Sequence, residues 1–402
     1  MEQRARVSRI LGKFWEVCPK KEKPMKSQNA PVGLSHVPVP QNPLDIVVYH
    51  IGGEGGYGPI ELLLKTFTKN CMLVVFEARS DTDVLVQAKR LAQSNIPLFI
   101  VNRCVSERAG KTPFYINKFP MSSSIFPPAP RAVNEHVVYG DGHTWQCHTW
   151  GENTENSSII EMDTVSIDEI VRAGIAPPPD ILSMDAQGSE YLILKGAKNT
   201  LREHVLCVAS EVEFFEIYAG QGLFTDQMAL LGDSGFRLVD ILSTQYWHPA
   251  AACGEGFLTV GEAVFFRLLE NMLEERNEHL GTFHELVKLA GVAATFSRLS
   301  YCIKILTHLE KKYPEQFSSL KNHDKYGELL SFYEFAKRDM HKYEMNNRHF
   351  FDVMNNWRFS SSRWYFSGGR GKPHNPLWYI GTPTGLKRTL RFLVRGFIPK
   401  YS

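Results

Sequence analysis

The stretch VVYHIGGEGGYGPIELL at residues 47–63 decides the fold, because it reads as a buried strand, a tight turn and the start of a helix. Its glycines let the backbone turn sharply and approach a ligand with no Cβ in the way: Gly52, Gly53, Gly55, Gly56 and Gly58. The N-terminus of the following helix offers free N–H groups. A nucleotide-like ligand is expected here, and a glycine-rich turn without a ligand is the alternative. The spacing G-x-G-x-x-G, which begins at Gly53, is weak evidence by itself.

Outward from this stretch, short apolar runs alternate with segments of helical periodicity. The runs are continuous and not alternating, which is typical of strands covered on both faces in a parallel sheet. Seven strands are expected: LDIVVYHI (44–51), LVVFE (73–77), PLFIVN (97–102), ILSMD (181–185), VLCVASEVE (205–213), FRLVDIL (236–242) and GEAVFFRL (261–268). Helices are expected near 60–67, 81–94, 166–173, 189–203 and 226–234. No helix separates the last two strands, so they should form an antiparallel hairpin at a sheet edge. The sequence predicts an α/β, Rossmann-like fold.

The chain divides into three parts by composition. Residues 1–42 read as a basic arm and linker, 43–268 as the α/β domain, and 269–402 as a helical extension with a basic tail. Residues 110–165 are rich in Pro, Ser, His and Trp and show little helical periodicity, so we interpret them as a cover over a ligand cleft.

Charge is uneven along the chain. Residues 1–26 hold eight Lys and Arg against three Glu, and residues 361–402 hold eight Lys and Arg against no acid, so the two ends carry +5 and +8. Because the net charge of the whole chain is +2, residues 27–360 carry −11. An acidic central domain argues against nucleic acid as a partner. The segment 386–397 carries leucines on one helical face and Lys and Arg on the other, which indicates contact with an anionic membrane, with a partner protein, or with its own domain.

The acid that ends the second strand, Glu77, is a candidate ribose ligand. A carboxylate at this position can accept hydrogen bonds from both ribose hydroxyls of NAD or of S-adenosylmethionine. Glu77 therefore does not separate the two cofactors.

The segment PDILSMDAQGSEYLILKGAKNTL at residues 179–201 does separate them. It resembles the FkbM-type methyltransferase family, in which a strand runs into D-x-(E/Q)-G-x-E and a helix ending L-K-G-A follows. The matching residues here are Asp185, Gln187, Gly188, Glu190, Leu194, Lys195, Gly196 and Ala197. The resemblance extends over about residues 43–268 and implies a class I methyltransferase fold, with S-adenosylmethionine as cofactor.

The resemblance also implies roles for individual residues. Gly52, Glu54 and Gly56 would line the methionine end of the cofactor, Glu77 would hold the ribose, and residues from Asn102 to Val105 would face the adenine. One position departs from the family pattern: His50 stands where the family usually has an acid before the first glycine. This departure puts the contact to the methionyl ammonium, and activity itself, in doubt.

Methyl transfer to a hydroxyl needs placement and a base. Carboxylates at the carboxyl ends of the fourth and fifth strands are suitably located, so Asp185, Glu190 and Glu213 are the catalytic candidates, with Glu211 beside them. Asp185 could also cap the next helix, and Glu190 could only favour its macrodipole. A histidine of the cover, His136, His143 or His148, is an alternative base.

No metal site is expected, because His143, Cys147, His148 and Cys253 lack the paired spacing of zinc sites. The seven scattered cysteines and the absence of a secretory pattern favour a cytoplasmic enzyme.

Three functions compete. The leading hypothesis is O-methylation of a sugar, glycan or small metabolite, since the family's assigned acceptors are mostly of these kinds. The second is an NAD-dependent oxidoreductase or nucleotide-sugar enzyme, which predicts a parallel sixth strand. The third is an inactive, methyltransferase-like binding module, suggested by His50.

Overall fold

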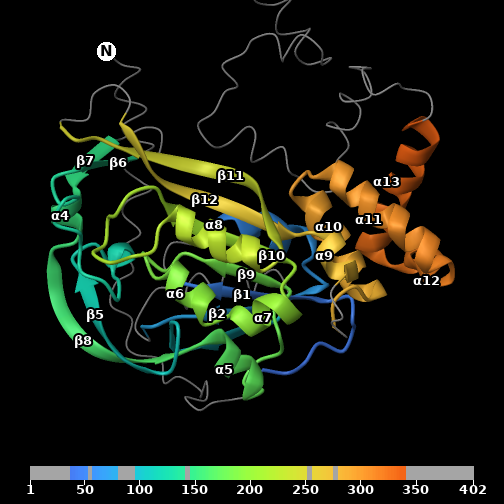
Figure 1. The fold of residues 1–402 in the computed structure, drawn as a ribbon, viewed down its shortest axis with the longest axis horizontal. Helices are drawn as coiled ribbons and strands as arrows, with labels where there is room; N and C mark the ends of the chain where they lie inside the picture. Colours follow the sequence, from blue (N-terminus) through green and yellow to red (C-terminus); the bar gives the residue numbers. More distant parts are fainter. Residues whose placement is uncertain are drawn as a thin grey trace, which may run out of the picture. The chain divides into compact units, whose positions relative to one another are not determined.

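The computed structural model describes residues 37–52, 57–79, 96–140, 145–250, 256–274 and 279–340. Their centre is a seven-stranded sheet in the order β11-β12-β10-β9-β1-β2-β3 (Figure 1). The strands are β1 (Ile46–Ile51), β2 (Cys71–Phe76), β3 (Leu98–Val101), β9 (Ile181–Met184), β10 (Cys207–Glu213), β11 (Phe236–Trp247) and β12 (Phe257–Arg267). β12 lies antiparallel between β10 and β11, and the other pairs are parallel. A mostly parallel seven-stranded sheet with an antiparallel hairpin at one edge is the expected Rossmann-like α/β architecture, so the predicted fold class is confirmed.

The antiparallel hairpin also answers the second functional hypothesis. An NAD-dependent oxidoreductase was expected to have a parallel sixth strand, whereas β11 and β12 pair antiparallel over almost their whole length. The strand topology therefore does not support that alternative.

Both faces of the sheet are covered, as the continuous apolar runs predict. Every residue of β1 and of β2 is buried. Ile46 and Val48 of β1 point into one hydrophobic cluster, and the alternate residues Val47 and Tyr49 point into the other. The second cluster is covered by α5 (Ile167–Arg172), α6 (Glu190–Lys195), α7 (Lys198–Glu203) and α8 (Phe224–Asp233).

The first cluster is covered mainly by helices from the end of the chain. Phe67 packs its ring near Tyr326, with centroids 5.5 Å apart, and Lys288 reaches Asp180 just before β9. The helices are α2 (Glu61–Thr66), α9 (Leu269–Glu274), α10 (Phe283–Thr295), α11 (Leu299–Lys312), α12 (Pro314–Ser319) and α13 (Asp324–Met340), with 3₁₀ turns η1 (Gly58–Ile60) and η3 (Leu320–Asn322). The division of the chain at residue 268 stays a prediction, but α10, α11 and α13 share one core with β1 and β2.

One predicted helix is divided. The expectation of a single helix over 189–203 is wrong, because the chain breaks at Gly196 between α6 and α7. A Cβ at Gly196 would lie 2.4 Å from the Ser106 carbonyl oxygen, so this backbone packs tightly against the loop after the third strand. Asp168 then caps α7 by accepting hydrogen bonds from the Asn199 and Thr200 N–H groups at 3.0 and 2.8 Å. The predicted helix over 81–94 lies outside the described residues.

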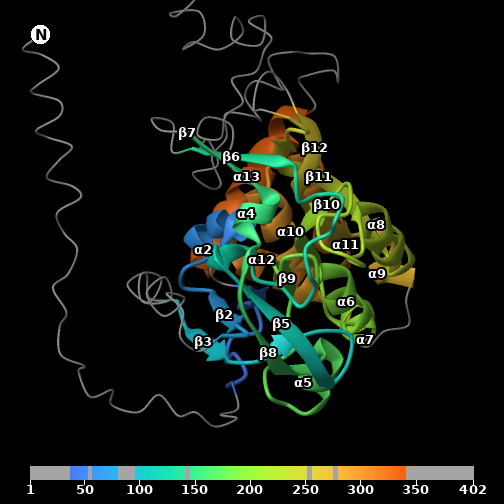
Figure 2. The same cartoon turned by 90° about the vertical axis from the view of Figure 1, so that its left-hand side faces the viewer.

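The predicted cover contains more regular structure than its composition indicates. A three-stranded sheet in the order β4-β8-β5 and a β6-β7 hairpin lie beside the main sheet (Figure 2). Their bounds are β4 (Cys104–Val105), β5 (Gly110–Asn117), β6 (His136–Gly140), β7 (Trp145–Thr149) and β8 (Asn156–Val165), with η2 (Pro120–Ser122) and α4 (Trp150–Asn153) between them. Trp150 anchors the hairpin region, since its indole N–H donates to the Ile217 carbonyl at 2.9 Å. Within the described parts of the chain, no helix is both long and apolar enough to cross a bilayer.

Candidate functional site

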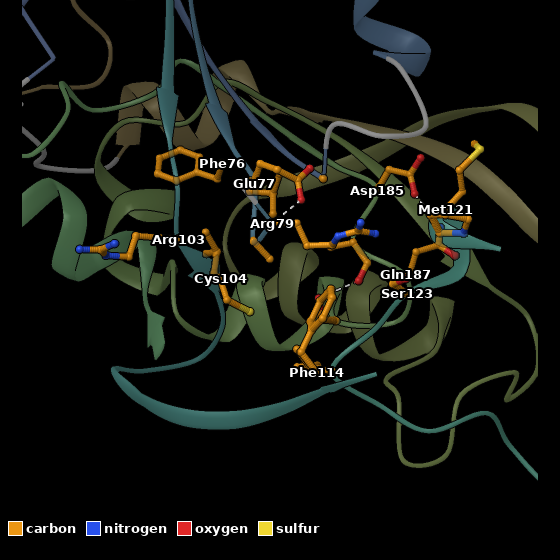
Figure 3. A pocket seen from close by; sticks show the side chains of 18 residues that line it. Phe76, Glu77, Arg79, Arg103, Cys104, Phe114, Met121, Ser123, Asp185 and Gln187 are labelled. Carbon is orange, nitrogen blue, oxygen red and sulfur yellow. Dashed lines mark hydrogen bonds between the residues drawn. The ribbon is translucent and has the colours of Figure 1, made fainter. Parts of the chain in front are cut away.

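A pocket opens at the carboxyl ends of β1, β2 and β9, where ligands bind in open α/β sheets. Its lining includes Gly52, Glu77, Arg79 and Asp185 from the sheet side, and Phe114 and Met121 from the cover (Figure 3). The structure therefore brings together three predicted site residues, Gly52, Glu77 and Asp185. It also shows that residues of the 110–165 segment form one wall.

Gly52 sits where three strands meet, and only glycine fits there. Its φ is +82°, and a Cβ would lie 1.8 Å from the Asp185 carbonyl oxygen. The Gly52 N–H donates to the Phe76 carbonyl at 3.0 Å, and the Asp185 N–H donates to the Ile51 carbonyl at 2.9 Å. These contacts fix the ends of β1, β2 and β9 against one another. Predicted ligands Gly53, Glu54 and Gly56 lie outside the described residues.

Glu77 lies directly after β2 and is 8% exposed. Its carboxylate accepts a hydrogen bond from the Arg79 N–H at 3.1 Å. Asn102 does not line the pocket; its side-chain amide donates to the Glu77 carbonyl at 2.9 Å and so supports the turn from outside. Its neighbours from Arg103 to Val105 do line the pocket.

Arg79 is a pocket residue that the sequence analysis missed. Its side chain extends into the pocket from the Glu77 side (Figure 3). The signal was present in the sequence FEARSD, where the cationic Arg79 follows the candidate ribose ligand Glu77 by two residues. A guanidinium at this place can pair with a carboxylate of a bound ligand.

Gln187 connects the predicted catalytic acid to the wall of the pocket. Its side-chain N–H₂ donates to Asp185 at 2.8 Å and to Glu211 at 3.0 Å. Its side-chain oxygen lies 2.9 Å from the Tyr218 hydroxyl, and its backbone carbonyl accepts from the Ser124 hydroxyl at 2.6 Å. Gln187 has a φ of +52°, which is uncommon for a residue with a side chain and is held by these four contacts.

The other two catalytic candidates are buried away from the pocket lining. Glu190 is fully buried, and one of its oxygens accepts from the Ala186 N–H at 2.5 Å. Glu213, at the end of β10, is also fully buried. Asp185 is thus the one predicted catalytic carboxylate that the described pocket contains.

Burial shifts the titration of the carboxyl groups in this region. It raises the pKa of Glu190 to about 7, with repulsion from Asp185 adding to the effect. Burial also raises the pKa of Asp185, Glu211 and Glu213, the last two helped by neighbouring carboxylates. Glu262 of β12, which the sequence analysis missed, has its pKa raised to about 7 by burial first and Asp185 second.

His50 and His136 make structural contacts. His50 is 1% exposed, its Nδ1 lies 3.0 Å from the Ser183 hydroxyl, and its ring lies 5.1 Å from that of Tyr57. His136 exchanges backbone hydrogen bonds with His248, and His143 lies outside the described residues. Among the residues that the structure describes, no group of His, Cys, Asp and Glu could hold a metal ion.

Residues 75–238 match the family model of the methyltransferase FkbM domain. This range of the chain is therefore similar to the FkbM-type methyltransferase domain. The matched range begins in β2 and ends in β11, so it includes Glu77, Asp185, Glu190 and Glu213. Gly52 and Glu262 lie outside it, although both lie next to this domain's candidate site.

Solved structures show weaker likeness. The FkbM methyltransferase of Methylobacillus flagellatus KT aligns with a TM-score of 0.31 at 13% identity, over 56% of this chain and 44% of that one. The precorrin-6y C5,15-methyltransferase of Geobacter metallireducens GS-15 aligns with a TM-score of 0.26 at 12% identity, over 56% and 80%. TrmN of Thermus thermophilus aligns with a TM-score of 0.22 at 10% identity, over 56% of this chain and 44% of that one. At such TM-scores these likenesses carry no argument about function, and no curated protein matches the chain.

Proposed function

We propose that the chain is an S-adenosylmethionine-dependent methyltransferase that methylates a hydroxyl of a sugar, glycan or small metabolite. One observation carries the proposal: Gly52, Glu77 and Asp185, three residues far apart in the sequence, line one pocket at the carboxyl ends of the strands. The FkbM domain and the strand order support methyl transfer as the reaction.

The pocket fits the cofactor in two ways. The backbone at Gly52 offers a surface without a side chain, and Glu77 offers carboxylate oxygens that can accept from ribose hydroxyls. Arg103, Cys104 and Val105 would lie against the adenine. Bound S-adenosylmethionine supplies an electrophilic methyl group on a sulfonium.

Asp185 is proposed as the general base. It lines the pocket, and Gln187 fixes one of its oxygens at 2.8 Å, so its second oxygen can accept a proton from a hydroxyl. Burial raises its pKa, and a base whose pKa is nearer to neutral removes a hydroxyl proton more effectively.

Calorimetry tests the cofactor. We expect S-adenosylmethionine to bind with a sub-millimolar Kd and NAD not to bind, because the hairpin topology and the FkbM domain favour the former. Glu77→Ala should weaken cofactor binding by about tenfold or more, since it removes a charged acceptor. Glu155→Ala, which removes an exposed acid paired with Lys118, is the control and should leave binding unchanged.

Activity with labelled cofactor tests the base. Asp185→Asn keeps the shape of the side chain and should lower turnover by about a hundredfold or more against an extract of glycans and metabolites. Full turnover in this variant would remove Asp185 as the base. Cofactor binding without transfer to any acceptor would instead favour the binding-module hypothesis that His50 suggests.

Location and partners are part of the proposal. The cysteines in the described residues are free thiols: Cys71, Cys104, Cys147, Cys207 and Cys302. Reduced thiols support a cytoplasmic enzyme. No nucleic-acid partner is proposed, given the acidic central domain, and the basic segment 386–397, proposed to contact a membrane or partner, lies outside the described residues.

A further inference from the structure

Five carboxyl groups gather beside the pocket, and we call them the carboxyl cluster: Asp185, Glu190, Glu211, Glu213 and Glu262. Glu190 and Glu213 are fully buried, and the other three are half-buried. They come from the ends of β9 and β10, the start of α6, and β12. Glu211 stands directly opposite Glu262 in the antiparallel pairing of β10 with β12. Like charges placed opposite each other on neighbouring strands destabilise a sheet, so this arrangement needs a reason.

Within the described residues, no Lys, Arg or His forms an ion pair with the carboxyl cluster. The ion pairs of the structure lie elsewhere, for example between Lys288 and Asp180. The groups that donate hydrogen bonds to the cluster are neutral, among them the Ala186 N–H on Glu190 and the Gln187 amide on Asp185 and Glu211. Neither oxygen of fully buried Glu213 meets a hydrogen-bond partner at ordinary distance among the described residues. The nearby Gln221 amide lowers the pKa of Glu213, but burial and the neighbouring carboxylates raise that pKa by more.

Burying carboxyl groups without a cation is costly, and proteins avoid the cost by leaving them protonated. The raised pKa of every member of the cluster is consistent with this state. A single base would suffice to remove one hydroxyl proton. One base for the reaction therefore does not account for the other four acids.

Position across the sheet separates the cluster from the adenosine end of the pocket. Glu77 follows β2, and the sheet order places β1 and β9 between β2 and β10. With strands about 4.8 Å apart, the β10 acids lie three strands, or about 14 Å, from the ribose ligand. Asp185 is the one member that lines the pocket, so the cluster begins at the β9 edge of the pocket and continues away from Glu77 toward β10 and β12.

Building on the proposed function, we propose that the methyl acceptor carries an ammonium group next to the hydroxyl that is methylated, and that the carboxyl cluster binds this ammonium. A cation close to these groups favours their ionised form, so binding releases protons from the cluster. The ammonium has no lone pair and serves only to hold the acceptor in place.

The reaction then balances with the residues present. The hydroxyl oxygen bonds to the methyl carbon as the carbon–sulfur bond breaks, the sulfonium becomes a neutral thioether, and the hydroxyl proton passes to the Asp185 carboxylate. Because the ammonium ionises the cluster, Asp185 is ready as a base only when a suitable acceptor is bound.

A second source of ammonium is the methionyl end of the cofactor itself. Glu262 lies near the end of the glycine turn, since one of its oxygens would be 3.0 Å from a Cβ at Gly58. The experiment therefore separates the two sources. S-adenosylhomocysteine is titrated first into the full chain, and ethanolamine or its uncharged counterpart ethylene glycol is titrated into the loaded protein. Calorimetry in two buffers of different ionisation enthalpy counts the protons released.

We expect S-adenosylhomocysteine to bind, and ethanolamine then to bind at least about tenfold more tightly than ethylene glycol with release of protons. Equal binding of the two probes overturns the ammonium proposal while leaving the proposed function intact. Proton release by S-adenosylhomocysteine alone, with none from ethanolamine, also overturns it, because the cofactor then occupies the cluster. Failure of S-adenosylhomocysteine to bind contradicts the proposed function instead.

Two variants tie the effect to the cluster. Glu213→Gln and Glu262→Gln should each reduce the preference for ethanolamine and the number of protons released, and both keep the side-chain shape. Glu155→Gln removes an exposed acid on β8's flank and should change neither quantity. If both cluster variants retain the full preference, the ammonium binds elsewhere and the proposal is wrong. Thermal melting of each variant confirms that it is folded.

Discussion

Glu262 should make the protein less stable as the pH rises. Its pKa is about 7 in the folded protein against 4.5 in its reference state, so the folded state holds the proton more tightly. The stabilisation is complete below pH 4.5 and is lost as the pH rises through about 7, at a cost of about 3 kcal/mol. Glu262→Gln removes this dependence.

Denaturant unfolding at pH 5 and pH 8 measures this dependence of stability on pH. We compare the free energy of unfolding of Glu262→Gln with that of the unchanged protein at each pH. The advantage of the variant should be about 2 to 3 kcal/mol larger at pH 8 than at pH 5. A difference that is the same at both pH values would show that Glu262 titrates normally.

Gly52 should not tolerate even one added carbon. Gly52→Ala forces a Cβ to 1.8 Å from the Asp185 carbonyl oxygen and places alanine at a φ of +82°, so the ends of β1 and β9 must separate. We expect a loss of at least about 2 kcal/mol in the free energy of unfolding, together with loss of cofactor binding.

Gly232→Ala is the matched control for that change. Gly232 lies in α8, and a Cβ there would meet no atom within 4 Å. Alanine should raise stability by up to about 1 kcal/mol because it restricts the unfolded chain. If both substitutions have the same effect in denaturant unfolding, the close approach at Gly52 is not what makes it necessary.

At the scale of elements, a buried ion pair adds to the apolar packing that holds α10 against the sheet. Lys288 donates to both oxygens of Asp180 at 2.9 and 3.1 Å, and Asp180 also accepts from the Val47 N–H at the start of β1. Lys288→Met leaves the buried carboxylate without its cation and should cost about 3 to 5 kcal/mol in urea unfolding. Lys304→Met, which breaks an exposed pair with Glu270, should cost less than about 1 kcal/mol.

The double variant Asp180→Asn with Lys288→Met checks the mechanism. It replaces both charges, so most of the lost stability should return. A double variant as unstable as the single Lys288→Met would show that packing of the lysine stem, and not the uncompensated charge, controls the attachment of α10.

Helices and strands were predictable from the sequence where a local pattern of apolar residues reflects which of their faces are buried. The strands of the main sheet are continuous apolar runs because both faces are buried, and the absence of a helix between residues 242 and 261 indicated the hairpin. The break at Gly196 and the β4-β8-β5 sheet were not predictable in this way. Both depend on contacts with segments distant in the sequence, such as the backbone at Ser106.

The same distinction applies to the site. Gly52, Glu77 and Asp185 each follow a strand, so parallel topology alone brings them to one edge. Glu262 follows from no local signal, because its place opposite Glu211 depends on the antiparallel register of β10 and β12. Arg79 enters the pocket only through the path of the chain after β2 (Figure 3).

For the whole molecule, the shared core predicts that the methyltransferase domain does not fold without the helices after residue 268. Leu286, Leu289 and Val292 of α10 are fully buried in the same cluster as Ile46 and Val48 of β1. A chain ending at residue 268 exposes that face of the sheet to water, at a cost of about 2 kcal/mol for each large side chain uncovered. Summed over the cluster, this exceeds the 5 to 15 kcal/mol that typically separates folded from unfolded domains.

Circular dichroism and calorimetric melting of the two chains test this expectation. The full chain should melt cooperatively, whereas the chain ending at residue 268 should show neither a melting transition nor binding of S-adenosylhomocysteine. A shortened chain that melts cooperatively and binds the ligand would mean that the FkbM-type domain is autonomous, with α10, α11 and α13 added to a face that is stable without them. The fold of this methyltransferase domain would then end at β12, where the sequence alone places its boundary.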